Sequence, residues 1–200
     1  MSDLTDVQLD ALREIGNIGA GNAATALSQL INQQVQIDVP SARVVSLADV
    51  PFIVGGPEKF TYSVYLPVIG EASGTMLALF AKESALLLVG YLLGEGQKEE
   101  DFGTELSQSA IKEVGSILCG SYLSAITQVI SLQMLASVPA LAGDMVGAIL
   151  DFILIEIGQA MDEVLFIKSE LSVTGVKLDT HLLFLPNPGA MEHILSAMGI

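Results

Sequence analysis

Residues 12–26 read LREIGNIGAGNAATA, and a similar run, IKEVGSILCGSYLSA, returns at residues 111–125. When the two runs are aligned, Ala11–Pro40 lies over Ala110–Pro139 without a gap, and 11 of the 30 residue pairs are identical. Self-similarity at a fixed distance is typical of a chain built from repeated structural units. The sequence therefore predicts one domain over residues 1–200, made of two units at about 6–94 and about 104–200.

The remainder of each unit carries the pattern of a strand pair followed by a helix. Apolar and polar residues alternate as in half-buried strands, and each closing helix ends at a glycine. The predicted elements are the strands Phe60–Val68, Thr75–Ala81, Val164–Val173 and about Thr180–Leu185, and the helices Glu83–Leu93 and Ala190–Met198. We expect an α/β (α+β) fold, with one antiparallel sheet shared by both units, flanked by long helices and related by a pseudo-two-fold repeat.

The two units differ most in the segment that precedes each strand pair. Ala140–Ile157 is strongly apolar and is predicted to be an added helix. Its counterpart Ser41–Pro57 is predicted to be extended.

The composition is strongly acidic, with 8 Lys+Arg against 23 Asp+Glu and a formal net charge of -15. Such a chain repels nucleic-acid phosphates and anionic lipid surfaces, so neither nucleic acid nor membrane is expected as a partner. The single cysteine, Cys119, leaves no intramolecular disulfide. Because the N-terminal residues are polar and do not resemble a signal peptide, we expect a reducing, cytoplasmic location.

Two uncharged windows are long enough to span a bilayer. They are Val114–Gly143 and Ile15–Ile37. Both contain several serine, threonine, asparagine or glutamine residues, which are unfavourable in a lipid core. We therefore predict that both windows are helices buried inside the protein.

The first long helix is predicted from about Asp6 to Ile31, with Thr5 and Gln8 spaced as a capping box. On a wheel of about 100° per residue, an apolar side faces the core. Its members are Leu12, Ile15, Gly19, Ala23, Ala26 and Leu30. The outward side carries a narrow stripe of Asp10, Glu14, Asn17 and Gly21.

Gly21 is the most informative member of this stripe, because a glycine inside a helix costs about 1 kcal/mol relative to alanine. An outward glycine beside Asn17 suggests that another surface approaches closely there. The alternative is a solvated helix face whose glycines serve packing. The return of the same spacing at Glu113, Gly115 and Gly120 favours a functional stripe.

The run at residues 12–26 resembles the CheC family of bacterial and archaeal chemotaxis phosphatases. The family pattern is Asp or Ser, three residues, Glu, two residues, Asn, and then 22 residues to Pro. Asp10, Glu14, Asn17 and Pro40 match this pattern fully. The resemblance covers nearly the whole chain, including the ending LPNPG at residues 185–189.

The second copy departs from the family pattern at one position. Ser109, Glu113 and Pro139 match, but Ser116 stands where the pattern has Asn. The resemblance therefore implies a complete first site and a degenerate, weaker second site.

The resemblance implies hydrolysis of the aspartyl phosphate on the response regulator CheY. Asn17 would orient the attacking water, Glu14 would pair with a lysine of the regulator, and Asp10 would be a supporting contact, as Ser109 would be in the second copy. An amide suits the role of Asn17 because it donates and accepts hydrogen bonds at once. No cofactor is expected on this chain, since the Mg²⁺ would be held by the regulator's own carboxylates.

Other partners and sites follow from the resemblance or are disfavoured by the residues. Asp144 lies where CheC-like proteins are thought to contact the receptor deamidase CheD, so an alternative function is a non-catalytic adaptor that binds CheD or sequesters phosphorylated CheY. His181 and His193 lie outside any cluster of metal ligands, so no metal site is expected. Cys119 is predicted to be a small core residue. Because two units complete each other, we expect a monomer.

Overall fold

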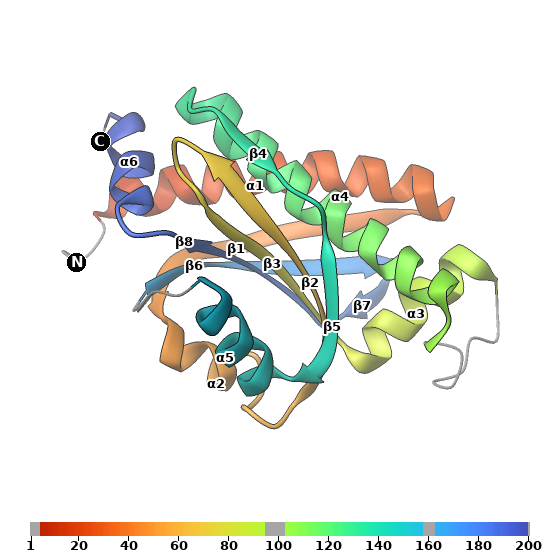
Figure 1. The fold of residues 1–200 in the computed structure, drawn as a ribbon. Coiled ribbons are helices and arrows are strands. Elements are labelled where there is room, and N and C mark those ends of the chain that lie inside the picture. Colours follow the sequence, from red (N-terminus) through yellow and green to blue (C-terminus); the bar gives the residue numbers. More distant parts are fainter. Residues whose placement is uncertain (1–4, 95–102, 158–162, 200) are drawn as a thin grey trace.

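The computed structural model describes residues 5–94, 103–157 and 163–199. Figure 1 shows helices packed on both faces of one sheet. The elements are α1 (Asp6–Ile31), β1 (Val35–Ser46), η1 (Leu47–Asp49), α2 (Val50–Ile53), β2 (Phe60–Gly70), β3 (Gly74–Ala81), α3 (Lys82–Leu93), α4 (Glu105–Ile130), β4 (Met134–Ala136), β5 (Ala140–Met145), α5 (Val146–Ile157), β6 (Glu163–Val173), β7 (Val176–Leu178), β8 (Thr180–Pro186) and α6 (Ala190–Ala197).

The sheet has the strand order β1-β6-β8-β3-β2-β4, with β5 also paired to β2 and β7 to β6. All of these pairings are antiparallel. The strand β1 of the first predicted unit lies beside β6 of the second, and β4 and β5 of the second lie beside β2 of the first. The mixed helix and antiparallel-sheet class is confirmed, whereas the pseudo-two-fold repeat stays a prediction.

Two apolar layers hold the fold together, one on each face of the sheet. Figure 1 shows α1 and α4 on one face and α2 and α5 on the other. The central strand β3 is buried along its whole length because both of its faces are covered. Its Met76 and Phe80 side chains join the α1/α4 layer, while Leu77 and Leu79 join the α2/α5 layer, as the alternation of a strand requires.

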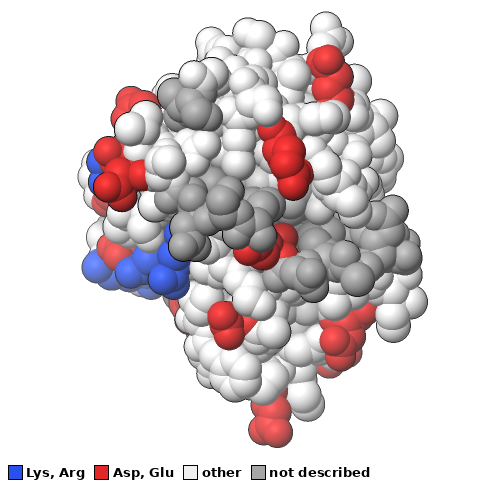
Figure 2. Space-filling model, turned by 90° about the vertical axis from the view of Figure 1, so that its left-hand side faces the viewer, with Lys and Arg blue, Asp and Glu red and all other residues white. Residues whose placement is uncertain are grey.

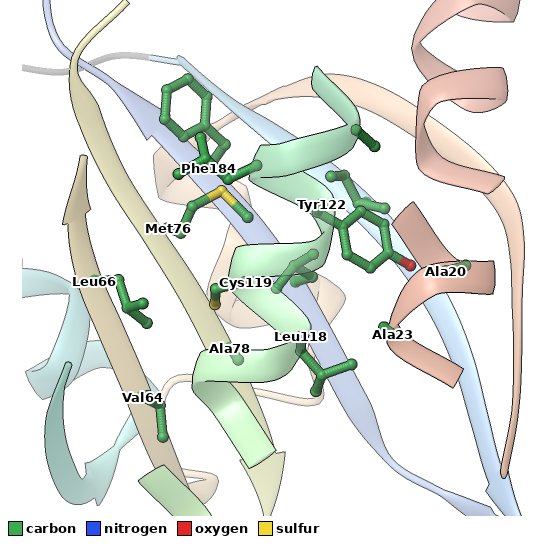
Figure 3. Close-up of a cluster of buried hydrophobic side chains, with 14 of the residues drawn as sticks. Ala20, Ala23, Val64, Leu66, Met76, Ala78, Leu118, Cys119, Tyr122 and Phe184 are labelled. Carbon is green, nitrogen blue, oxygen red and sulfur yellow. The ribbon is translucent and has the colours of Figure 1, made fainter. Parts of the chain in front are cut away.

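The helix α4 lies beside α1 over the sheet, as Figure 3 shows. Cys119 points toward the sheet, and burial raises the pKa of its thiol, so it serves as a small core residue. Tyr122 points toward α1, and its hydroxyl lies 3.2 Å from the hydroxyl of Ser169. A Cβ added at Gly19 would lie 2.9 Å from the Cα of Tyr122, so Gly19 lets the two helices touch.

Local sequence signals give most element boundaries correctly. The capping box is present, with the Gln8 amide donating to the Thr5 hydroxyl oxygen and the Thr5 amide donating to the Gln8 side chain. α1 occupies the predicted range. The predicted strand pairs and closing helices agree with β2, β3, β6, β8, α3 and α6 to within two residues.

Two segments contradict the sequence predictions. Ala140–Ile157 is not all helix, because its first six residues form β5, which pairs with the β2 residues Phe60–Tyr65. Ser41–Pro57 is not all extended, because a turn of 3-10 helix and the helix Val50–Ile53 follow β1. Contacts with β2 decide the conformation of β5, whereas the 3-10 turn is capped locally by the Ser46 hydroxyl, which accepts from the amide of Ala48.

The end of α1 also differs from the wheel. Leu30 was expected in the core but is 39% exposed, and Ala26 is only half-buried. The buried side instead continues from Ala23 through Leu27 and Ile31. Steps of four residues turn this side by about 40° each around the helix, which takes it away from Leu30.

Only the first part of each uncharged window is helical, in α1 and α4; the first window ends in β1, and the second contains β4 and part of β5. Of the described helices, α4 alone is long and apolar enough to cross a membrane by length and composition, and half of its most apolar window is buried. Its buried side chains pack in the α1/α4 layer, as expected for a core helix.

Candidate functional site

The predicted stripe lies on the solvent side of α1. Asp10, Glu14, Asn17 and Gly21 are all exposed, while the opposite side of the helix packs on the sheet and on α4. In a helix, residues three and four apart are neighbours on one face. The structure therefore brings the four side chains into one row about 16 Å long, at 1.5 Å of rise per residue.

The charged end of the stripe is partly neutralised within the helix. The Arg13 guanidinium lies 3.2 Å from the Asp10 carboxylate, and the two side chains are 52% and 71% exposed. An ion pair this open contributes little to stability. Sequence reasoning did not single out Arg13, although its spacing of three residues from Asp10 favours this contact.

Glu14 and Asn17 are available to a partner. Among the residues that the structure describes, neither side chain has a hydrogen-bond or ion-pair partner. A solvated carboxylate and a solvated amide can therefore bind an approaching surface without breaking an internal contact.

Gly21 has open space where a side chain would stand. A Cβ added there would meet nothing within 4 Å. The neighbouring glycine Gly16 is different, because a Cβ there would lie 3.0 Å from Cγ1 of Val39. Packing thus accounts for Gly16 and for Gly19, but it gives no reason for glycine at position 21.

The corresponding row on α4 is less complete. Ser109 and Glu113 are exposed, and Gly120 again has open space around it. Ser116, however, is half-buried, and its hydroxyl donates a 2.7 Å hydrogen bond to the carbonyl oxygen of Lys112. The side chain that replaces the amide is therefore short and bonded to its own helix.

Asp144 lies far along the chain from both stripes. It is exposed near the end of β5, and its carboxylate accepts a 2.7 Å hydrogen bond from the amide of Met145, just ahead of α5. The exposed side chains Phe152 and Ile155 of α5 follow it in the chain. Asp144 is therefore accessible, and it belongs to the strand β5 rather than to either helix.

No metal centre is formed by the described residues, where no three His, Cys, Asp or Glu side chains come together. His193 contacts the carbonyl oxygen of Glu71 at 3.0 Å. Figure 2 shows acidic side chains scattered over one face of the molecule and basic ones gathered at one edge. That face therefore lacks the broad basic field typical of nucleic-acid binding.

His181 belongs to a small ionic network on the α2/α5 face of the sheet, where its ring centroid lies 5.7 Å from that of Phe166. The Lys59 ammonium donates to the Asp179 carboxylate at 2.7 Å and to the carbonyl oxygen of Val54 at 2.8 Å. The other Asp179 oxygen lies 3.0 Å from Nε2 of His181. Burial lowers the pKa of His181, against the opposing pull of Asp179.

This network predicts a pH-dependent stability. Unfolded His181 takes up a proton near its ordinary pKa of about 6.5, before the folded residue does, so the free energy of unfolding should fall as the pH drops through that value. Urea unfolding at about pH 7.5 and about pH 5.5 measures this. In His181→Gln part of the fall should disappear, whereas in His193→Gln it should persist. If the free energy of unfolding falls with pH by the same amount in both variants, the assignment to His181 is wrong.

Three comparisons place the chain among known proteins. A model of the CheC-like family matches residues 7–43. The CheY-P phosphatase CheC of Bacillus subtilis is 32% identical over 200 residues, which cover 98% of this chain and 96% of that protein.

Solved structures share the fold. The crystal structure of Thermotoga maritima FliY has a TM-score of 0.80 at 18% identity, covering 100% of this chain and 98% of that chain. A complex of CheX with CheY, BeF3 and Mg from Borrelia burgdorferi has a TM-score of 0.51 at 17% identity, covering 84% of this chain and 96% of that chain. On its identity with the B. subtilis protein over nearly its full length, the chain belongs to the CheC-like family.

Proposed function

We propose that this chain is a phosphatase that hydrolyses the aspartyl phosphate of the chemotaxis response regulator CheY, with its working centre on the exposed side of α1. The observation that carries the proposal is the pair Glu14 and Asn17, both exposed and both unpartnered among the described residues. They lie one turn apart on a chain whose relative of 32% identity is named a CheY-P phosphatase.

The reaction needs few groups from the phosphatase. Water attacks phosphorus, the bond between phosphorus and the aspartyl oxygen breaks, and the products are inorganic phosphate and a free carboxylate. In this proposal the Mg²⁺ belongs to the regulator, and a phosphatase need only place the water in line. The Asn17 amide oxygen can accept a hydrogen bond from the water while its NH2 group donates one to a phosphoryl oxygen, which fixes the angle of attack.

The neighbouring stripe residues support this approach. Glu14 lies one turn before Asn17 and would pair with a lysine of the regulator, anchoring α1 over the phosphoryl group. The missing side chain at Gly21 lets the regulator's surface come close on the far side of Asn17. Asp10 would contribute a further polar contact at the other end of the row.

The α4 row would bind a regulator but hydrolyse its aspartyl phosphate slowly. Because the Ser116 hydroxyl is bonded to the carbonyl of Lys112, it neither reaches as far as an amide nor offers a free donor. A loss of about 2.7 kcal/mol in transition-state stabilisation corresponds to about 100-fold in rate. Ser109 and Glu113 would keep their docking roles.

Restoring the amide should revive this second centre. In an Asn17→Ala background, Ser116→Asn is expected to raise phosphoryl loss at least about tenfold, since it replaces about 1.4 kcal/mol or more of lost stabilisation. Rates are measured on prephosphorylated CheY. Ser116→Ala in the same background is the control and should give no gain. A rate for Ser116→Asn equal to that of the control would refute docking at α4.

An adaptor function toward CheD is a second proposal, and exposure around α5 favours it. Phe152 is 48% exposed and Ile155 is 79% exposed, close in sequence to the accessible Asp144. Such apolar side chains are suited to binding a protein surface. We place the protein in the cytoplasm and expect it to act as a monomer.

One experiment separates the two functions. Phosphoryl loss from purified, prephosphorylated CheY is measured with and without this chain, and again with CheD added. Acceleration by the chain establishes the phosphatase. Binding of phosphorylated CheY or of CheD without any acceleration would leave an adaptor and contradict the catalytic role of α1.

A further inference from the structure

Arg13 is the only basic residue in α1, and it stands beside the proposed working stripe. It lies three residues after Asp10 and four before Asn17, so it is a surface neighbour of both. Its side chain is 52% exposed, and the contact with Asp10 joins one terminal nitrogen to one carboxylate oxygen at 3.2 Å. Because a guanidinium carries five N–H donors, most of its hydrogen-bonding capacity remains open.

The charge of Arg13 is unusual for its surroundings. The chain has a net charge of -15, and the stripe itself contributes the carboxylates of Asp10 and Glu14. The proposed substrate is also anionic there, because a phosphoryl group sits among carboxylates. Like charges repel across such a contact, and a cation among them weakens the repulsion and supplies one attractive contact.

Asp10 restrains this cation. A long arginine side chain loses rotamer freedom when it binds, and a side chain already held in place loses less. The ion pair therefore holds the guanidinium beside Asp10, at the N-terminal end of the stripe, before the regulator arrives. Asp10 in this arrangement acts through Arg13.

The second row repeats the feature. Lys112 occupies the position aligned with Arg13 and is the only basic residue of α4. Each row thus has one cation immediately before its glutamate, at Glu14 and Glu113. A lysine carries the charge but lacks the planar fork that binds two oxygens of a carboxylate or a phosphoryl group.

We propose that Arg13 is a recognition residue of the α1 site, which binds the anionic phosphoaspartyl pocket of the regulator through a guanidinium positioned by Asp10. This inference rests on the proposed phosphatase function. It predicts a contribution to docking and not to the chemical step.

The test is steady-state kinetics on phosphorylated CheY at low and high salt. Arg13→Ala should lower kcat/KM about tenfold at low salt, through KM, with kcat nearly unchanged, because a rim charge acts on association. The dependence of kcat/KM on salt should become weaker. Arg13→Lys should recover part of the loss, and Asp10→Asn should cost little once Arg13 is already absent.

Arg43→Ala is the matched control. Arg43 is exposed on β1 and lies over the Phe166 ring on the sheet face opposite α1, at 5.9 Å from the ring centroid. The variant removes the same charge from the chain and should leave KM unchanged.

The outcomes separate the inference from the function on which it rests. Wild-type rates for Arg13→Ala, with Asn17→Ala inactive, would overturn the role of Arg13 and leave the phosphatase intact. If Arg43→Ala lowers kcat/KM by the same factor, the effect comes from the net charge of the chain, and the inference is overturned too. If the wild-type chain does not accelerate the reaction, the phosphatase fails, and the affinity of Arg13→Ala for CheY carrying BeF3 then decides the docking role.

Discussion

Asn17→Ala is expected to slow phosphoryl loss from CheY by at least about 100-fold, equivalent to about 2.7 kcal/mol of transition-state stabilisation. The amide is the one group in the stripe that can both accept from water and donate to a phosphoryl oxygen. Because the side chain is exposed and has no partner among the described residues, its loss should leave the stability of the fold nearly unchanged.

The measurement is single-turnover decay of phosphorylated CheY at saturating phosphatase, with binding followed separately. Retained binding with lost turnover identifies Asn17 as catalytic. Ser116→Ala is the control on α4 and should change the rate little, because its hydroxyl already bonds to Lys112. If Ser116→Ala lowers the rate of phosphoryl loss as much as Asn17→Ala does, the main centre lies on α4 and the proposal is contradicted.

Alanine at Gly19 and at Gly21 is expected to have opposite effects on stability. At Gly19 the new methyl would lie 2.9 Å from the backbone of Tyr122, so α1 and α4 must separate, at about 1–3 kcal/mol. At Gly21 there is open space, and alanine should stabilise the helix by about 0.5–1 kcal/mol. Urea unfolding of the two variants measures both changes.

The Gly21→Ala variant also tests the contact surface. If the regulator approaches closely beside Asn17, the added methyl should lower phosphatase activity several-fold in a protein that is more stable than wild type. Gly120→Ala provides the matched change on α4, where space is also open. Full activity in Gly21→Ala would show that the regulator does not need the space at this position.

Much of the candidate site could be predicted from residues 10–21 alone. Which side of α1 meets solvent follows from helical periodicity, so Asp10, Glu14, Asn17 and Gly21 were predicted on one exposed face, where the structure has them. Two features of the rows appeared only in three dimensions. They are the contact of Arg13 with Asp10 and the hydrogen bond that ties Ser116 to its own helix.

The sequence by itself determined the ends of α1, the bounds of the paired strands and the outward stripe, because caps, turns and periodicity are set by residues a few positions apart. Only the tertiary structure decided that β1 crosses to pair with β6 and that Ala140–Met145 becomes a strand beside β2. Those pairings join residues far apart in the chain, and their free energy comes from partners that no local pattern contains. Local periodicity therefore determined which face of α1 is exposed, while long-range strand pairing determined the sheet on which that helix packs.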